Sequence, residues 1–224
     1  MIEQKAYLLL LCIRKNEHRS LMQIQKENIR NLIIAIARDE FVTHGFRDAS
    51  MRRVADKSGV ALSNIYNYFK SKDELFSEIL QPVLTEIDGT LRKHNNEENL
   101  TLDYFSSDDY QRRDLVSMVT LVESYKIELN LLLFQSAGSS YENFREQITE
   151  RNAEKGQEYL LKMKEKYPKI SIDISPFFIH VMGSMWVNIL AEVVSRSLSH
   201  DELTQFISEY IEFGTAGWQK LMKI

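Results

Sequence analysis

Three residues, Ala55, Gly59 and Ile65, constrain the fold of this chain more than any other feature of its sequence. They stand four and then six residues apart. A small residue lets two helices cross closely, a glycine makes the tight turn between them, and a β-branched residue locks the second helix onto the first. The spacing predicts a helix-turn-helix, with short helices over 51–57 and 62–69.

The sequence on either side of this motif predicts two further helices. An apolar stripe begins after Glu27 and predicts a helix that ends at Gly45, a residue that can adopt a left-handed conformation. Ser50 is a suitable N-cap for the next helix. Ser71 and Glu74 have the spacing of a capping box, which predicts the start of a fourth helix. The stripe consists of Ile29, Leu32, Ile33, Ile36, Ala37 and Phe41.

The rest of the chain also has the periodicity of helices. Only three prolines and eight glycines interrupt 224 residues. Long helices are expected over about 111–135 (with a break near Tyr125), 140–167, 175–197 and 201–222, and a polar loop with a short helical turn over 94–109. The predicted fold is all-α: an N-terminal extension at 1–21 that we expect to be dispensable, a three-helix helix-turn-helix domain at 22–72, and a larger helical ligand-binding and dimerisation domain at 73–224.

Charge separates the two predicted domains. Residues 1–72 carry 13 Lys and Arg against 7 Asp and Glu, and residues 73–224 carry 15 against 25. The net charges of +6 and −10 suggest that only the N-terminal part approaches a polyanion. The single cysteine, Cys12, suits a reducing compartment, and the longest apolar run, 6–13, is too short to span a bilayer. A soluble cytoplasmic protein is expected, with no membrane partner.

The stretch from Ile29 to Leu75 resembles the DNA-binding domain of the TetR family of bacterial transcriptional regulators. The resemblance covers about a fifth of the chain. It implies a homodimer that binds a palindromic double-stranded DNA operator as a repressor and releases it when a small-molecule effector enters the helical body. The matching residues are Phe41, Gly45, Phe46, Ser50, Val54, Ala55, Gly59, Val60, Ile65, Tyr66, Tyr68, Phe69, Lys70, Ser71, Lys72, Asp73, Glu74 and Leu75.

In such a fold the helix at 62–69 would enter the major groove of DNA. Side chains at its start would face base edges, those along its exposed side would contact phosphates or thymine methyl groups, and two lysines at the next helix start would hold a phosphate. Phe69 is expected in the core. The candidate DNA-binding residues are Ser50, Met51, Leu62, Ser63, Asn64, Tyr66, Asn67, Tyr68, Lys70 and Lys72.

The helical body contains candidates for an effector pocket and for a dimer interface. A surface of methionine and aromatic side chains suits an adaptable apolar cavity, although ordinary core packing explains each residue as well. The two last helices carry more apolar surface than one chain can cover. The pocket candidates are Met118, Tyr125, Phe134, His180, Met182, Met185 and Trp186; the interface candidates are Gly183, Ile189, Val193, Phe206, Tyr210, Ile211 and Trp218.

The sequence does not favour catalysis. The five histidines lie far apart, and none forms a metal-ligand pair at helical spacing. The Ser-rich segment 136–140 lacks the strand-turn-helix context of a nucleophile elbow. We therefore expect neither an enzyme nor a bound metal or cofactor. The alternative to a DNA-binding regulator is a helical protein-interaction or ligand-binding protein without operator binding.

Overall fold

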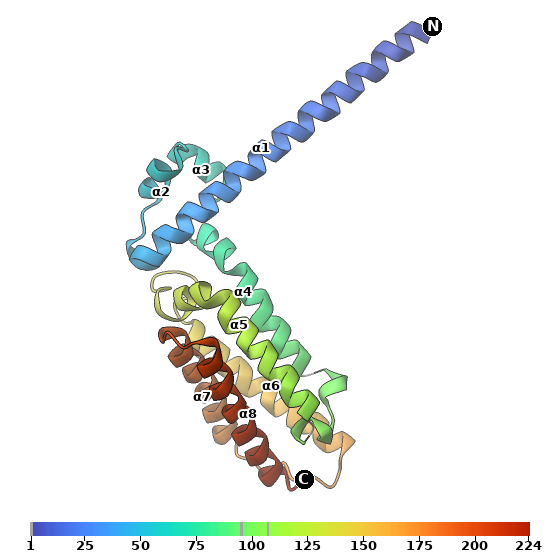
Figure 1. Ribbon diagram of the computed structural model, residues 1–224, viewed down its shortest axis with the longest axis vertical. Coiled ribbons are helices and arrows are strands. Elements are labelled where there is room, and N and C mark those ends of the chain that lie inside the picture. Colours follow the sequence, from blue (N-terminus) through green and yellow to red (C-terminus); the bar gives the residue numbers. More distant parts are fainter. Residues whose placement is uncertain (1, 95, 107) are drawn as a thin grey trace. The chain divides into compact units, whose positions relative to one another are not determined.

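A computed structural model describes residues 2–94, 96–106 and 108–224; for residues 2–21, 93, 94 and 97 it describes the backbone alone. Every regular element of the described residues is helical (Figure 1), so the predicted all-α fold is confirmed. The elements are α1 (Ile2–Asp48), α2 (Met51–Ser58), α3 (Leu62–Tyr68), α4 (Lys72–His94), the 3₁₀ helices η1 (Glu97–Asn99) and η2 (Leu102–Phe105), α5 (Asp108–Phe134), α6 (Phe144–Lys166), α7 (Pro176–Ser195) and α8 (His200–Met222).

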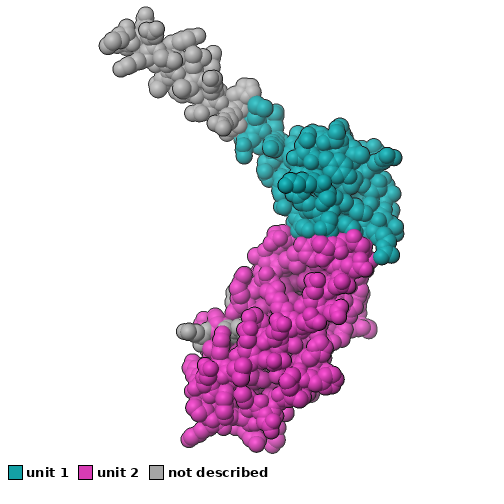
Figure 2. All heavy atoms as spheres, turned by 180° about the vertical axis from the view of Figure 1, so that it is seen from behind, with its two compact units in different colours: residues 1–79 teal, residues 80–224 magenta. Residues whose placement is uncertain are grey.

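The chain divides into two compact units, residues 1–79 and 80–224 (Figure 2). Helix α4 begins in the first unit and continues into the second. The expectation that residues 1–21 form a dispensable extension lies outside the described side chains and stays a prediction.

The first unit has an aromatic core. The rings of Phe41, Phe46 and Phe76 contact one another with centroid distances of 4.9 to 5.9 Å. Gly45 leaves helical geometry with φ 68° and ψ 169°, which turns the chain so that Phe46 enters this core. The positive φ that sequence reasoning expected is present, although ψ differs from the left-handed helical value. Phe69 is 2% exposed, which confirms its expected place in the core.

In the second unit, α7 packs on α6 and α5, and α8 packs on α5. The α6–α7 contact is close because Gly183 lacks a side chain: a Cβ atom there would lie 3.2 Å from the backbone oxygen of Thr149. The predicted break in α5 is confirmed, since Tyr125 leaves helical geometry at φ −125°, ψ 22°. An ion pair between Arg151 and Asp88, at 2.7 Å, joins α6 to α4.

One end of the second unit is closed by η2, which is the short helical turn expected within the polar loop. The Tyr104 hydroxyl donates a hydrogen bond to Asp114, and the Tyr159 hydroxyl donates one to the backbone oxygen of Asn99. Burial, followed by the Asp114 carboxylate, raises the pKa of the Tyr104 hydroxyl. These phenols stay protonated and therefore act as donors that fix the loop.

Candidate nucleic-acid interface

The predicted helix-turn-helix is present in α2, α3 and the turn between them. Ala55 is 8% exposed and Ile65 is fully buried, so each packs at the crossing of the two helices. Gly59 ends α2 in the left-handed conformation, with φ 67° and ψ 12°. The three residues thus have the places that their spacing predicted.

Helix α3 turns a polar side toward solvent. Ser63, Asn64, Tyr66 and Asn67 are exposed, and Tyr66 retains 43% of its accessible surface. The Asn67 side-chain amide donates to the Asn64 side-chain oxygen at 3.3 Å, across one turn of the helix. This side presents amide, hydroxyl and phenol groups, which are the side-chain types that hydrogen-bond base edges and phosphates.

Two other candidates on α3 are only partly accessible: Leu62 and Tyr68 are half-buried. Helix α3 begins after Ala61, which has no side-chain oxygen for a cap. Its stability therefore depends on tertiary packing, above all on Ile65 against α2.

The start of α4 is capped as predicted, but it does not offer a phosphate site. The Ser71 hydroxyl accepts the Glu74 backbone N–H at 3.0 Å, and the Glu74 carboxylate accepts the backbone N–H of Lys70. A carboxylate already occupies the place where an anion would bind. Of the groups expected to hold a phosphate there, only the exposed ammonium of Lys70 remains.

Lys72 does not have the role expected for it. Its ammonium donates to three backbone oxygens at the end of α1, those of Phe46 at 2.7 Å, Arg47 at 3.2 Å and Ala49 at 3.2 Å. Burial lowers the pKa of this ammonium, and the charge of Asp48 opposes the shift. Lys72 therefore caps a helix end rather than reaching a phosphate.

At the start of α2, the predicted N-cap Ser50 is confirmed, whereas the candidate DNA contact Met51 differs from expectation. The Ser50 hydroxyl is the N-cap and accepts the backbone N–H of Arg53 at 3.4 Å. Met51 is 9% exposed, because its side chain faces the core of the first unit. Met51 has almost no surface to offer to DNA, and we remove it from the interface.

A residue that the sequence reasoning missed, Glu40, connects α1 to this motif. It is fully buried, and its carboxylate accepts hydrogen bonds from the Ser50 backbone N–H at 3.0 Å, from Arg53 at 2.6 Å and from Lys57 at 3.2 Å. Burial alone raises the pKa of the Glu40 carboxyl, but these hydrogen bonds outweigh it and hold the pKa below 4.5. The available signal was a carboxylate within the apolar stripe, three residues after Ala37.

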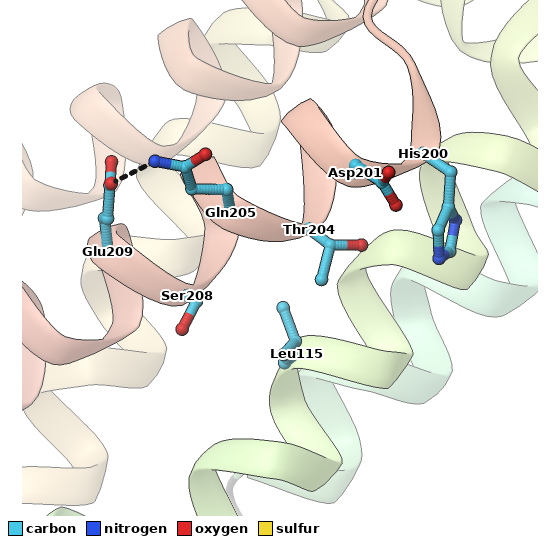
Figure 3. Close-up of a pocket in the computed structure, with 7 residues that line it drawn as sticks. All are labelled: Leu115, His200, Asp201, Thr204, Gln205, Ser208 and Glu209. Carbon is cyan, nitrogen blue, oxygen red and sulfur yellow. Dashed lines mark hydrogen bonds between the residues drawn. The ribbon is translucent and has the colours of Figure 1, made fainter.

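The effector candidates are not gathered in one cavity. The second unit has a shallow pocket of about 400 Å³ between α5 and α8 (Figure 3) and another of about 300 Å³ between α6 and α7. The first is lined by Leu115 of α5 and by six residues of α8 that have polar side chains. His180 lines the second with Arg145, Ser184 and other polar residues. The other six candidates, which are Met118, Tyr125, Phe134, Met182, Met185 and Trp186, line neither.

Three of the interface candidates make contacts within their own chain. Val193 is only 6% exposed, and Gly183 faces the backbone of α6. The ring of Trp218 lies 6.0 Å from that of Phe178 and packs against the core of its own unit. Val193 and Gly183 therefore do not belong to the surface that a second chain could contact. The remaining candidates, Ile189, Phe206, Tyr210 and Ile211, are half-buried.

Apolar surface nevertheless remains open on α7 and α8. Phe177 and Phe213 retain 76% and 70% of their accessible surface. Beside Phe213, a Cβ atom at Gly214 or Gly217 would meet no atom within 4 Å. Helix α7 is long and apolar enough to cross a membrane by length and composition, and only 33% of its most apolar window is buried. Within the described part of one chain, these two phenylalanines therefore stay largely uncovered.

The same part of the chain that forms the helix-turn-helix matches a known family. Residues 33–79 match the family described as bacterial regulatory proteins, tetR family. The match covers the helix-turn-helix and the start of α4, about a fifth of the chain. The relatives of the chain are named as regulators and repressors, which agrees with the expectation that it is not an enzyme. Among the described residues, no three His, Cys, Asp or Glu side chains could together hold a metal ion.

The curated relatives of the chain are distant. The chain is 28% identical over 95 residues to the uncharacterized HTH-type transcriptional regulator YdgC of Bacillus subtilis, a match that covers 42% of the chain and 46% of YdgC. It is 31% identical over 68 residues to the HTH-type transcriptional repressor KstR2 of Rhodococcus jostii, covering 30% of the chain and 33% of KstR2. The chain thus spans less than half the length of these curated relatives.

The fold of the whole chain is similar to that of solved structures. A TetR-like transcriptional regulator from Rhodococcus sp. RHA1 aligns over 84% of this chain and 96% of its own, with a TM-score of 0.57 and 18% identity. At that identity the likeness establishes the fold alone. It supports the all-α architecture of a helix-turn-helix unit followed by a helical body.

Proposed function

We propose that this chain is a transcriptional repressor that binds a palindromic DNA operator as a homodimer and is released by a small-molecule effector. The observation that carries the proposal is the polar, exposed side of α3, which Ile65 anchors on α2. Ser63 and Asn64 lie at the start of α3, the part of a recognition helix that contacts base edges in the major groove. Tyr66, Asn67 and Lys70 supply groups for the DNA backbone.

The dimer would form through α7 and α8. Phe177 and Phe213 are large and exposed, and the open backbone at Gly214 and Gly217 would let a second helix approach closely. A symmetric pair of such surfaces would cover apolar area that one chain leaves in water. Its two-fold axis would set two recognition helices on half-sites about 34–36 Å apart, or somewhat more, on one face of DNA.

Release by an effector would use the helical body. The groove between α6 and α7 contains His180, the pocket candidate that lines a described pocket. An effector that favours one arrangement of the body over another would change operator affinity by about 1–3 kcal/mol, or several-fold to a hundredfold. A regulator of this kind works where the chromosome is, so we place it in the cytoplasm.

Selection from a random DNA pool tests the proposal. The purified chain is incubated with random 30-base-pair duplexes, and bound DNA is amplified and sequenced over several rounds. We expect enrichment of an inverted repeat whose half-site spacing fits a two-fold dimer. Failure to enrich any sequence, with folding verified by circular dichroism, would favour the alternative of a helical interaction or ligand-binding protein without operator binding.

A further inference from the structure

The buried carboxylate of Glu40 has contacts along the whole length of α2. Its partners are the backbone N–H of Ser50 at the cap, Arg53 in the first turn and Lys57 in the last turn. The Arg53 guanidinium also donates to the backbone oxygen of Asp48 at 2.7 Å. Helix α2 is therefore attached to α1 by directional bonds at both of its ends.

Stability alone is a weak reason for a carboxylate at this position. Glu40 lies on the apolar side of α1, one turn from Ala37 and next to Phe41, and both of these neighbours are buried. A buried ion pair is often no more stabilising than apolar side chains of similar volume. The carboxylate instead contributes structural specificity, because its hydrogen bonds fix one position of α2 on α1.

The same contacts also reduce the positive charge that α2 can offer to DNA. Helix α2 carries the basic residues Arg52, Arg53 and Lys57. The side chains of Arg53 and Lys57 are 44% and 51% exposed, yet their charged groups lie 2.6 Å and 3.2 Å from the Glu40 carboxylate. A cation held by a carboxylate does not displace counterions from a phosphate as a separate charge would.

We infer that Glu40 is a positioning residue for DNA binding: it fixes the helix-turn-helix on α1 and keeps Arg53 and Lys57 from contacting phosphates. The inference rests on the proposed function. It assigns Arg53 and Lys57 a role in fixing the position of α2 on α1. Phosphate contact is left to residues such as Lys70, whose ammonium is exposed.

The salt dependence of DNA binding distinguishes the two roles. The slope of log Kobs against log salt concentration changes by about 0.9 for each phosphate contact that is lost. We would measure it by fluorescence anisotropy with the full chain on two duplexes of equal length. One is the duplex that the wild-type chain selects from a random pool, and the other has the same composition in scrambled order.

The variants are Arg53→Gln, Lys57→Gln and Glu40→Gln, with Lys70→Gln as the control that removes an exposed lysine. Lys70→Gln should flatten the slope by about 0.9 on both duplexes. Arg53→Gln and Lys57→Gln should leave the slope on the scrambled duplex unchanged but weaken binding to the selected duplex about tenfold or more. Glu40→Gln should steepen the slope, because it frees both cations.

The outcomes separate the inference from the proposed function. A flattening of about 0.9 for Arg53→Gln or Lys57→Gln, equal to that of Lys70→Gln, would overturn the inference and leave DNA binding intact. If Glu40→Gln does not fold, the other two variants still decide the question. A folded wild-type chain that binds neither duplex would refute the proposed function, and the inference with it.

Discussion

The ammonium of Lys72 lies 4.5 Å from the centroid of the Phe46 ring and donates a hydrogen bond to the Phe46 backbone oxygen at 2.7 Å. One side chain at the start of α4 thus contacts both the ring and the backbone of the residue that follows the turn at Gly45. The unpaired carbonyl groups at a helix end need such a donor, and a cation is favoured there by the helix dipole.

The first prediction concerns this cap. Replacing Lys72 with methionine keeps an unbranched side chain only one atom shorter but removes the donor, so we expect the free energy of unfolding to fall by about 1–2 kcal/mol. Urea titration followed by circular dichroism measures the change. The salt slope of DNA binding should not change, because this ammonium does not reach a phosphate.

Lys70→Met is the matched control for Lys72→Met. Lys70 is exposed two residues away, so the same replacement should change stability by less than about 0.5 kcal/mol. If Lys70→Met destabilised the chain as much as Lys72→Met does, the cap would not explain the effect.

The second prediction compares two glycines that have free space around them. A Cβ atom at Gly59 or at Gly89 would meet no atom within 4 Å, but Gly59 has φ +67° and Gly89 lies inside α4. Gly59→Ala should therefore destabilise the chain by about 1–2 kcal/mol through backbone strain alone. Gly89→Ala should stabilise it by about 0.5–1 kcal/mol. Thermal unfolding of both variants gives the sign of each stability change. A change of the same sign in both would contradict the explanation by backbone strain at Gly59.

Local patterns were sufficient to predict helices α2 to α8, although not the start of α1 at Ile2. Ala55, Gly59 and Ile65 act through short-range geometry, so their spacing alone located the helix-turn-helix. Apolar periodicity gave the long helices of the body and the break at Tyr125, because a helix that packs on neighbours must place its apolar residues on one side.

Side-chain roles that depend on a distant partner could not be predicted in this way. Lys72 reaches Phe46, 26 residues earlier in the chain, and Glu40 reaches Lys57, 17 residues later. From the sequence alone, a basic residue near a recognition helix is interpreted as a phosphate contact, because its backbone partner is not known. Gly183 likewise suggested an interface between chains, whereas its close contact is with α6 of its own chain.

The third prediction concerns acid stability. The folded-state pKa of Glu40 lies below its ordinary value of 4.5, so the carboxylate stabilises the fold above pH 4.5 and this contribution is lost as pH falls through the lower, folded-state pKa. Glu40→Gln should lower stability at pH 7 by about 2 kcal/mol, less than for a fully buried pair because the cations are half exposed. As the pH is lowered from 7 to 3, the urea concentration at the unfolding midpoint should then fall less steeply for Glu40→Gln than for the wild-type chain.

Glu27→Gln is the control for this pH series. Glu27 lies on the same helix as Glu40, but its side chain is 60% exposed, so the substitution removes a carboxylate that is not buried. It should retain the wild-type loss of stability in acid. Parallel curves for wild type and Glu40→Gln would contradict a stabilising role for the buried carboxylate.

The fourth prediction concerns base readout. Asn64 is exposed at the start of α3, where its amide can pair with adenine. Asn64→Ala should cost about 1–3 kcal/mol of discrimination at one base pair of each half-site. Repeating the random-pool selection with the variant would show relaxed preference at that position. Preference unchanged at every position would remove Asn64 from the base-contacting residues.

The last prediction concerns the dimer. Phe213 is 70% exposed on α8 beside two glycines with open space, so Phe213→Glu should place a charge in the proposed interface without disturbing the chain's own core. We expect the dimer dissociation constant to rise at least a hundredfold, or about 3 kcal/mol, with operator binding lost and helicity retained. Sedimentation velocity at micromolar concentration measures this.

Leu161→Glu is the control, because Leu161 is 58% exposed on α6 and a charge there should leave the dimer intact. Val193→Glu should instead unfold the body, since Val193 is buried within one chain. A Phe213→Glu variant that still sediments as a dimer would rule out this surface as the interface.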